Sequence, residues 1–209
     1  MGGNAMLLDG CHEGKRFYLL EGSGSTYQYA FRDTALDSLE QGECEACGRT
    51  LSQWRFSGPH HLLLEGGPKY PDRLEFTGAG STPLLLSRRA ADVFRGSGIT
   101  GIGETVPIQT SHESGPLPED APEYVLARIC GRIDLDLPKM GLKKKNLCRV
   151  CGSFEWNRQR LSPLCLDASA WDGSDLCRVD SIPGYVICTD RVVALVKKQK
   201  LKGFSFRAL

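Results

Sequence analysis

Two copies of one short cysteine motif constrain this chain more than any other feature. The copies are Cys44-Glu-Ala-Cys47-Gly48 and Cys148-Arg-Val-Cys151-Gly152, and they use four of the nine cysteines in the 209 residues. Two residues between thiolates let a tight turn aim both sulfurs at one tetrahedral ion, and the glycine that follows can adopt a positive φ. Each motif is therefore interpreted as a zinc knuckle, and each supplies two ligands.

Together the knuckles supply the four thiolates of a closed, structural zinc site, with no position left for catalysis. We expect Cys44, Cys47, Cys148 and Cys151 to bind one shared zinc ion that joins distant parts of the chain. Acidic residues flank the first knuckle and Lys143–Lys145 flank the second, so opposite charges favour their approach. Separate or non-functional knuckles and a redox-active pair stay open, although neither motif has a thioredoxin-like setting.

The other five cysteines are expected to be ordinary buried thiols: Cys11, Cys130, Cys165, Cys177 and Cys188. A thiol enzyme with Cys11 or Cys165 as its nucleophile is an alternative, but it needs a partnered histidine that the sequence does not identify. The N-terminus has no secretory pattern and no apolar run approaches the ~20 residues of a membrane span. We therefore expect a cytoplasmic protein without a disulfide framework.

A second repeat has nearly the same offset as the knuckles. The segments that begin at Leu84 and Val186 align without a gap at a shift of 102, and the knuckles repeat at a shift of 104. The alignment places Ser87 on Thr189, Arg89 on Arg191 and Gly101 on Gly203. Two independent features at almost one offset predict two related halves.

Each copy of the repeat predicts a strand, a helix, a turn and a second strand. The first strands are Leu84–Leu86 and Val186–Cys188, the N-caps are Ser87 and Thr189, and the second strands follow Gly101 and Gly203. In the second helix, valines and a leucine at helical spacing form an inward face. The other expected elements are strands over 16–21 and 123–134 and a short helix over 34–41.

The predicted fold class is α+β with two related halves packed together. Each half is a small, mostly antiparallel sheet with a strand–helix–strand unit and a zinc knuckle. The expected boundaries are 1–104 with the knuckle 44–48, a linker over 105–122, and 123–209 with the knuckle 148–152. The linker holds four prolines among serine, glycine and acidic residues. The first half carries ten basic and thirteen acidic side chains, and the rest of the chain carries sixteen basic and twelve acidic ones. The two parts therefore have opposite net charges, which favours docking of the halves.

No nucleophile elbow, zinc-protease motif, phosphate-binding loop or dinucleotide-binding motif is present. His60 and His61 are interpreted as part of a loop or strand. Trp54 and Trp156 follow their knuckles closely and are expected to pack beside them, and Trp171 is expected in the core or an interface.

These motifs resemble the double-CXXCG motif proteins, a paralogous family of myxobacteria grouped with immunity proteins of bacterial toxins. The two knuckles carry the resemblance together with the terminal block, which runs from Asp175 through Gly184–Arg191 to Leu201–Leu209. Residues 1–15 look like an extension of the usual start. The resemblance implies a non-enzymatic protein that binds and neutralises a cognate toxin, with the four knuckle cysteines as metal ligands.

Two functions follow as hypotheses. The first is an immunity protein that occludes a toxin with an interface of about 800 Å² per partner. The alternative is a zinc-ribbon-like nucleic-acid-binding or regulatory module, which draws on a basic cluster around the second knuckle: Lys143–Lys145, Arg149, Arg158 and Arg160. The net charge of +1 makes a generic nucleic-acid binder the weaker hypothesis, and a membrane partner is not expected.

Overall fold

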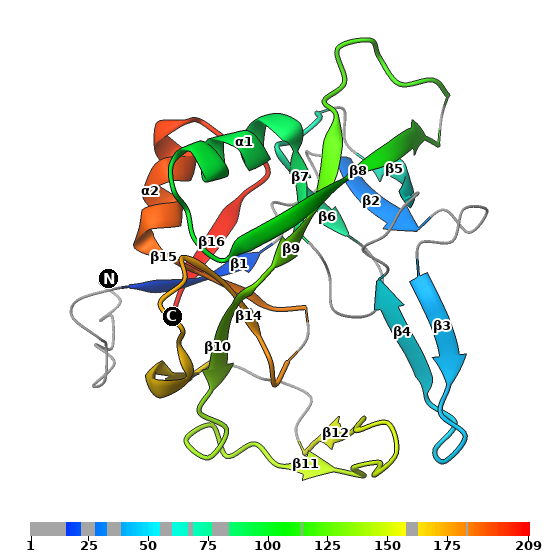
Figure 1. Ribbon diagram of the computed structural model, residues 1–209, viewed down its shortest axis with the longest axis vertical. Helices are drawn as coiled ribbons and strands as arrows, with labels where there is room; N and C mark the ends of the chain where they lie inside the picture. Colours follow the sequence, from blue (N-terminus) through cyan, green and yellow to red (C-terminus); the bar gives the residue numbers. More distant parts are fainter. Residues whose placement is uncertain are drawn as a thin grey trace, which may run out of the picture.

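The computed structural model is an α+β molecule made mostly of strands, with two α-helices (Figure 1). It describes residues 16–21, 28–32, 39–54, 60–66, 69–76, 84–113, 115–157, 163–182 and 184–209. Several predicted features lie outside these ranges: Cys11, residues 34–38 of the expected helix, Arg158, Arg160 and the extension 1–15. None of the described helices has the length and apolar character needed to cross a membrane.

Six strands close into a barrel. In their order around the barrel they are β2 (Gln28–Arg32), β5 (His60–Gly66), β8 (Ile102–His112), β9 (Tyr124–Ile129), β7 (Leu84–Ser87) and β6 (Arg73–Phe76). The pairs β5–β8 and β2–β6 are parallel and the other four are antiparallel. Buried side chains from five of the strands fill its interior: Ala30, Leu62, Leu64, Leu74, Leu85, Tyr124 and Leu126.

The second sheet is open and has six strands. Their order is β13 (Leu166–Asp167), β10 (Gly131–Leu135), β14 (Leu176–Val179), β15 (Val186–Thr189), β1 (Phe17–Glu21) and β16 (Ser205–Ala208). The 3₁₀ helix η2 (Ala168–Ala170) follows β13. β1, from the start of the chain, pairs with β15 and β16 from its end. A strand of the first sequence half is thus an inner strand of a sheet otherwise built by the second half.

The second sequence half likewise contributes a strand to the barrel, which is otherwise built by the first half and the start of the expected linker. The stretch 123–134, expected as one strand, contains β9 in the barrel and β10 in the open sheet, with Cys130 between them. The stretch 105–122, expected as a linker, begins with eight residues of β8, which pairs with β5 and β9. Because strands cross the expected boundaries in both directions, the two sequence halves do not form two separate sheets.

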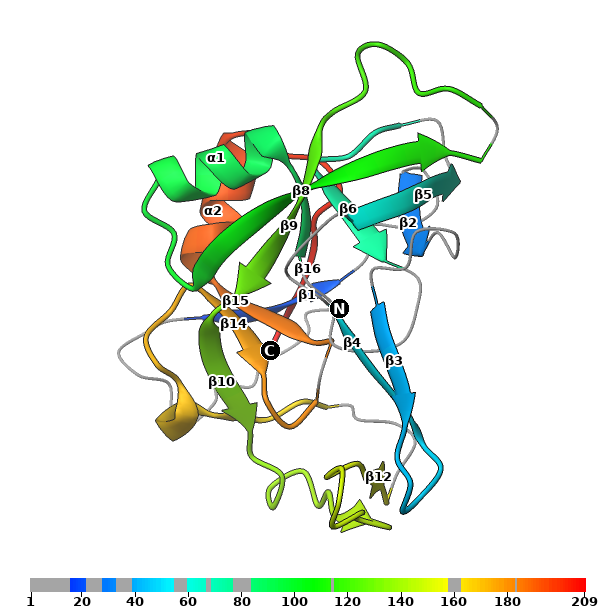
Figure 2. The same cartoon turned by 45° about the vertical axis from the view of Figure 1, so that its right-hand side comes forward.

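Both copies of the predicted repeat unit are present. β7 leads into α1 (Arg88–Gly96) and β15 leads into α2 (Asp190–Lys198), and the helices lie side by side in both views (Figures 1 and 2). The predicted inward face of α2 is confirmed, since Val192, Val193 and Val196 are buried. Side chains of both helices share one core cluster with both sheets, so the two copies bury their apolar faces against each other.

A buried carboxylate ties the first copy of the repeat to the second. Asp72 accepts hydrogen bonds from the Ser87 hydroxyl (2.8 Å) and from the Lys202 backbone N–H (2.8 Å). Arg89 donates to Asp72 (3.4 Å) and to the Gln199 carbonyl (3.0 Å). Ser87 also caps α1 as predicted, because its hydroxyl accepts the Ala90 N–H.

An equivalent arrangement around Asp175 ties the second copy of the repeat to the first. This buried carboxylate accepts hydrogen bonds from the Thr189 hydroxyl (2.9 Å), from the Thr100 N–H (3.1 Å) and from Arg191 (2.8 Å). Arg191 also donates to the Ser97 carbonyl (3.0 Å). Thr189 is the N-cap residue of α2 as predicted, but its hydroxyl donates to Asp175 and does not make the expected cap hydrogen bond. We call the Asp72 and Asp175 groups together the reciprocal contact.

Two glycines let the chains cross within the reciprocal contact. Gly101 and Gly203 have φ values of +85° and +84°. A Cβ on Gly101 would lie 2.0 Å from the Leu176 carbonyl oxygen, and one on Gly203 would lie 2.4 Å from that of Arg73. Glycine is needed at both positions because the backbone is left-handed and another backbone lies against it.

One predicted element of the first half is wrong. Of the short helix expected over 34–41, the described residues 39–41 belong to a strand, β3 (Leu39–Glu43), which pairs with β4 (Thr50–Trp54). The cross-strand partner lies beyond the knuckle, so tertiary pairing overrides the weak local preference for a helix.

Candidate metal centre

Two hairpins extend from the body of the molecule and meet at their ends (Figures 1 and 2). One is β3–β4, and the other is β11 (Lys144–Lys145) with β12 (Glu155–Trp156). Each forms a two-stranded sheet of its own in the part of the chain that the structure describes. We call these two hairpins, residues 39–54 and 144–156, the cysteine tip.

The two turns of the cysteine tip have the same backbone design. In the first, the Gly48 N–H donates to the Cys44 carbonyl (2.7 Å); in the second, the Gly152 N–H donates to the Cys148 carbonyl (3.0 Å). The glycines have φ values of +67° and +72°, as the motif predicts. Each turn therefore holds its two cysteines in a fixed, matching geometry.

All four knuckle sulfurs lie within 4.8 Å of one another. The Cys44 and Cys148 sulfurs are 3.7 Å apart, and so are those of Cys47 and Cys151. Zinc–sulfur bonds of about 2.3 Å in a tetrahedron place sulfurs about 3.8 Å apart, so the cluster has the dimensions of a tetrathiolate site. The structure thus brings together the four predicted residues in an arrangement that can hold a metal ion.

Polar side chains surround the sulfurs at the exposed end of the cluster. The Ser153 hydroxyl lies 2.9 Å from the Cys151 sulfur and 3.8 Å from that of Cys47. Arg49 donates to Ser153 (3.4 Å) and forms an ion pair with Glu155 (2.8 Å) that crosses between the hairpins. Arg49 also brings a positive charge toward a cluster that is anionic when ionised.

The thiols of the cluster differ in acidity. Hydrogen bonds from the Ser153 hydroxyl and backbone lower the pKa of Cys151 to about 6. Backbone hydrogen bonds from Ala46 and Cys47 favour the Cys44 thiolate, but burial and the neighbouring thiols outweigh them and raise the pKa of Cys44 to about 11. Without a metal, neighbouring thiolates repel one another, so the four thiols do not all ionise together. A cation bound between them would stabilise all four thiolates.

Sequence reasoning missed Ser153 and Arg49. Each directly follows a knuckle glycine, and at a shift of 104 they occupy equivalent positions. Extending the repeat by one residue would have found them as candidates, but the crossed contact of one with the other depends on how the hairpins meet.

The remaining cysteines are only partly as expected. Cys177 and Cys188 are buried, and burial raises the pKa of each thiol to about 12. Cys165 is half-buried and Cys130 is exposed, so the expectation of buried thiols is wrong for Cys130. It lies between β9 and β10, where the chain passes from one sheet to the other.

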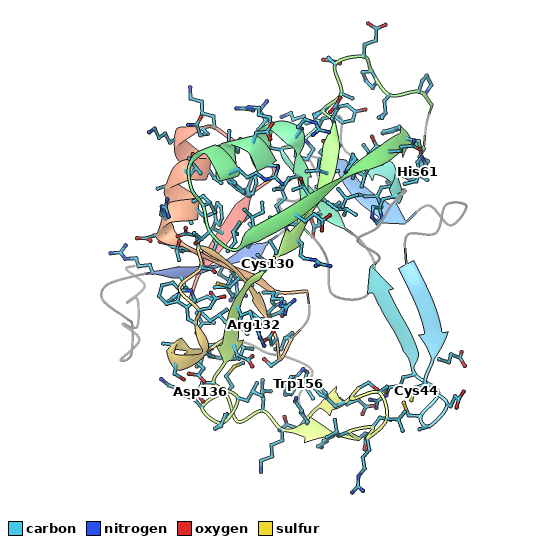
Figure 3. All side chains as sticks on the ribbon, viewed as in Figure 1. Cys44, His61, Cys130, Arg132, Asp136 and Trp156 are labelled. Carbon is cyan, nitrogen blue, oxygen red and sulfur yellow. The ribbon has the colours of Figure 1, made fainter. Side chains whose placement is uncertain are left out.

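The histidines and tryptophans lie in the framework. His60 and His61 are in β5, and His60 is buried in that strand. Trp156 lies beside its knuckle and packs against the core under the open sheet (Figure 3). Trp171 makes an edge contact with Phe17 in the same core, as expected, and the side chain of Trp54 lies outside the described part.

Comparison with known proteins gives a distant similarity. No known family model matches the chain. The chain is similar to the mitochondrial dihydroxy-acid dehydratase astD of Aspergillus terreus, with 30% identity over 177 residues. The matched region covers 80% of this chain and 27% of the dehydratase, so the chain spans about a quarter of that protein's length.

Proposed function

We propose that this protein is an immunity protein that neutralises a cognate toxin by occlusion, and that a structural zinc ion bound by Cys44, Cys47, Cys148 and Cys151 holds its cysteine tip together. The observation that supports the zinc site is that four sulfurs, contributed by two motifs far apart in the chain, lie within 4.8 Å of one another. Four thiolates complete a tetrahedral shell, which is the chemistry of a structural rather than a catalytic zinc.

The terminal block supports a binding role. The resemblance to immunity proteins rests on this block together with the knuckles. The polar side chains of the block serve the fold: Asp175, Thr189 and Arg191 hydrogen bond within the reciprocal contact. Gly203 is needed for a backbone crossing. These groups are engaged in holding the two copies of the repeat together, which suits a rigid binding protein.

A nucleic-acid-binding module remains the second candidate because basic side chains gather on the second knuckle. Lys143, Lys144, Lys145 and Arg149 are all exposed. A mobility shift that weakens steeply with salt would favour it over the immunity function.

The zinc site is tested by elemental analysis of the purified chain. We expect one zinc per chain, and none after Cys47→Ser and Cys151→Ser are combined. Two zinc ions per chain, or none in the unmodified chain, would contradict the shared site.

The immunity function is tested in cells that express the product of the adjacent gene. Co-expression of this chain should restore growth, and the two purified proteins should form a stable complex. Absence of rescue would overturn the proposal. Dehydration of a dihydroxy acid by the purified chain, the reaction in the name of the similar dehydratase, would also overturn it.

A further inference from the structure

Two large apolar side chains near one turn of the second knuckle are exposed. Leu147 is 56% exposed and Val150 is 75% exposed, and among the side chains whose burial the structure describes no other large hydrophobic one is exposed. Single exposed hydrophobic residues are ordinary on a protein surface. Two of them on one turn, with the other large apolar side chains of described burial at least partly covered, indicate a surface made for contact.

Cations surround this apolar pair. Lys143, Lys145 and Arg149 are exposed, and no carboxylate pairs with them among the residues that the structure describes. Lys144 lies 4.4 Å from the centre of the Phe154 ring, where a cation–π contact holds it. We call residues 143–150 the basic turn.

The cysteine site fixes the conformation of the basic turn. Cys148 lies between Leu147 and Arg149, and Cys151 directly follows Val150. The Cys148 N–H also donates to the Ser153 carbonyl (2.8 Å), which closes the turn. A turn held at both cysteines loses little conformational entropy when it binds, so its contacts contribute more fully to affinity.

We propose that the basic turn is the anchor by which this protein docks on its partner, with Val150 and Leu147 entering an apolar hollow rimmed by acidic side chains of a partner protein. The inference rests on the proposed immunity function and names the surface that performs it. Apolar anchors at the centre of an interface dominate binding energy, and flanking charges complementary to the partner steer the approach.

The surroundings favour a protein over a nucleic acid. Glu45 is exposed on the facing knuckle, and Glu155 is 60% exposed beside Arg49. These carboxylates repel a phosphate backbone, and aliphatic side chains gain nothing from phosphates. A protein surface can meet both the cations and the apolar pair.

The pseudo-repeat supplies a matched control for the test. Val150 and Ala46 hold the same position in the two knuckles, and both are exposed. The full-length zinc-loaded protein is compared with Val150→Asp and Ala46→Asp, and the probe is the purified product of the adjacent gene. Titration calorimetry gives each Kd, elemental analysis confirms one zinc per chain in each variant, and a short DNA duplex at low salt is titrated in parallel.

We expect Val150→Asp to weaken binding at least about ten-fold and Ala46→Asp to change it less than about three-fold. Equal affinity of both variants for a partner that the unmodified protein binds overturns the basic turn as anchor and leaves the immunity function standing. No binding by the unmodified protein overturns the immunity function and the anchor with it. DNA binding without partner binding, weakened by Val150→Asp and not by Ala46→Asp, assigns the turn to nucleic acid instead.

Discussion

The reciprocal contact and the cysteine tip join the same two copies of a repeat by opposite means. In the reciprocal contact, buried carboxylates and a shared apolar core hold strands and helices against one another. In the cysteine tip, two short hairpins meet through four sulfurs and an exposed ion pair. An isolated two-stranded hairpin is marginal in water, so a metal ion bound by the four sulfurs would stabilise the tip, whereas burial stabilises the centre.

The largest difference between the regions is expected for alanine at their glycines. Gly101→Ala places a Cβ 2.0 Å from a backbone oxygen, whereas Gly152→Ala meets nothing within 4 Å at a similar positive φ. We expect a loss of at least about 3 kcal/mol in unfolding free energy for the first and about 1 kcal/mol for the second. Denaturant titration of both variants measures the difference. Equal losses would show that the crossing at Gly101 relaxes easily.

Removal of a carboxylate from the reciprocal contact should have the next largest effect. Asp175→Ala leaves the Thr189 hydroxyl and the Thr100 N–H without their acceptor, which should cost about 2–4 kcal/mol. Asp180→Ala is the control, because Asp180 pairs with Arg132 at the surface and should cost less than about 1 kcal/mol. If chemical denaturation gives the same value for both variants, the burial of Asp175 contributes little.

Metal removal should loosen the tip and spare the centre. After chelation, amide exchange should accelerate in β3, β4, β11 and β12, while β14, β15 and both helices keep their protection. Mass spectrometry of exchanged fragments resolves these regions. Global loss of protection would show that the centre also depends on the metal.

Thiol reactivity distinguishes the regions without unfolding the protein. At pH 7 the metal-free Cys151 thiol is mainly a thiolate, because its pKa is about 6, whereas Cys188, with a pKa of about 12, is protonated. Iodoacetamide should therefore label Cys151 rapidly and Cys188 hardly at all, and labelling of Cys151 should slow as the pH falls below 6. Metal should protect Cys151. Equal labelling rates of Cys151 with and without metal would contradict its role as a ligand.

The sequence predicted local features well where a residue type performs a local task. The Ser87 cap, the inward face of α2 and the positive φ of Gly48 and Gly152 follow from hydrogen bonding, helical spacing and backbone sterics. The failures involve distant partners. Thr189 is a residue type that often caps helices, but its hydroxyl donates to Asp175 instead. Residues expected in a linker form part of β8, because they hydrogen bond to the neighbouring strands β5 and β9.

By itself, the sequence determined that this protein is built on a repeat and that two matched cysteine turns belong to it, because spacing and residue chemistry are properties of the chain. Only the tertiary structure decided that the halves exchange strands, that four sulfurs lie within 4.8 Å and that Val150 is exposed beside cations with which no carboxylate of the described residues pairs. These facts depend on which distant surfaces bury each other, and burial is a property of the whole fold.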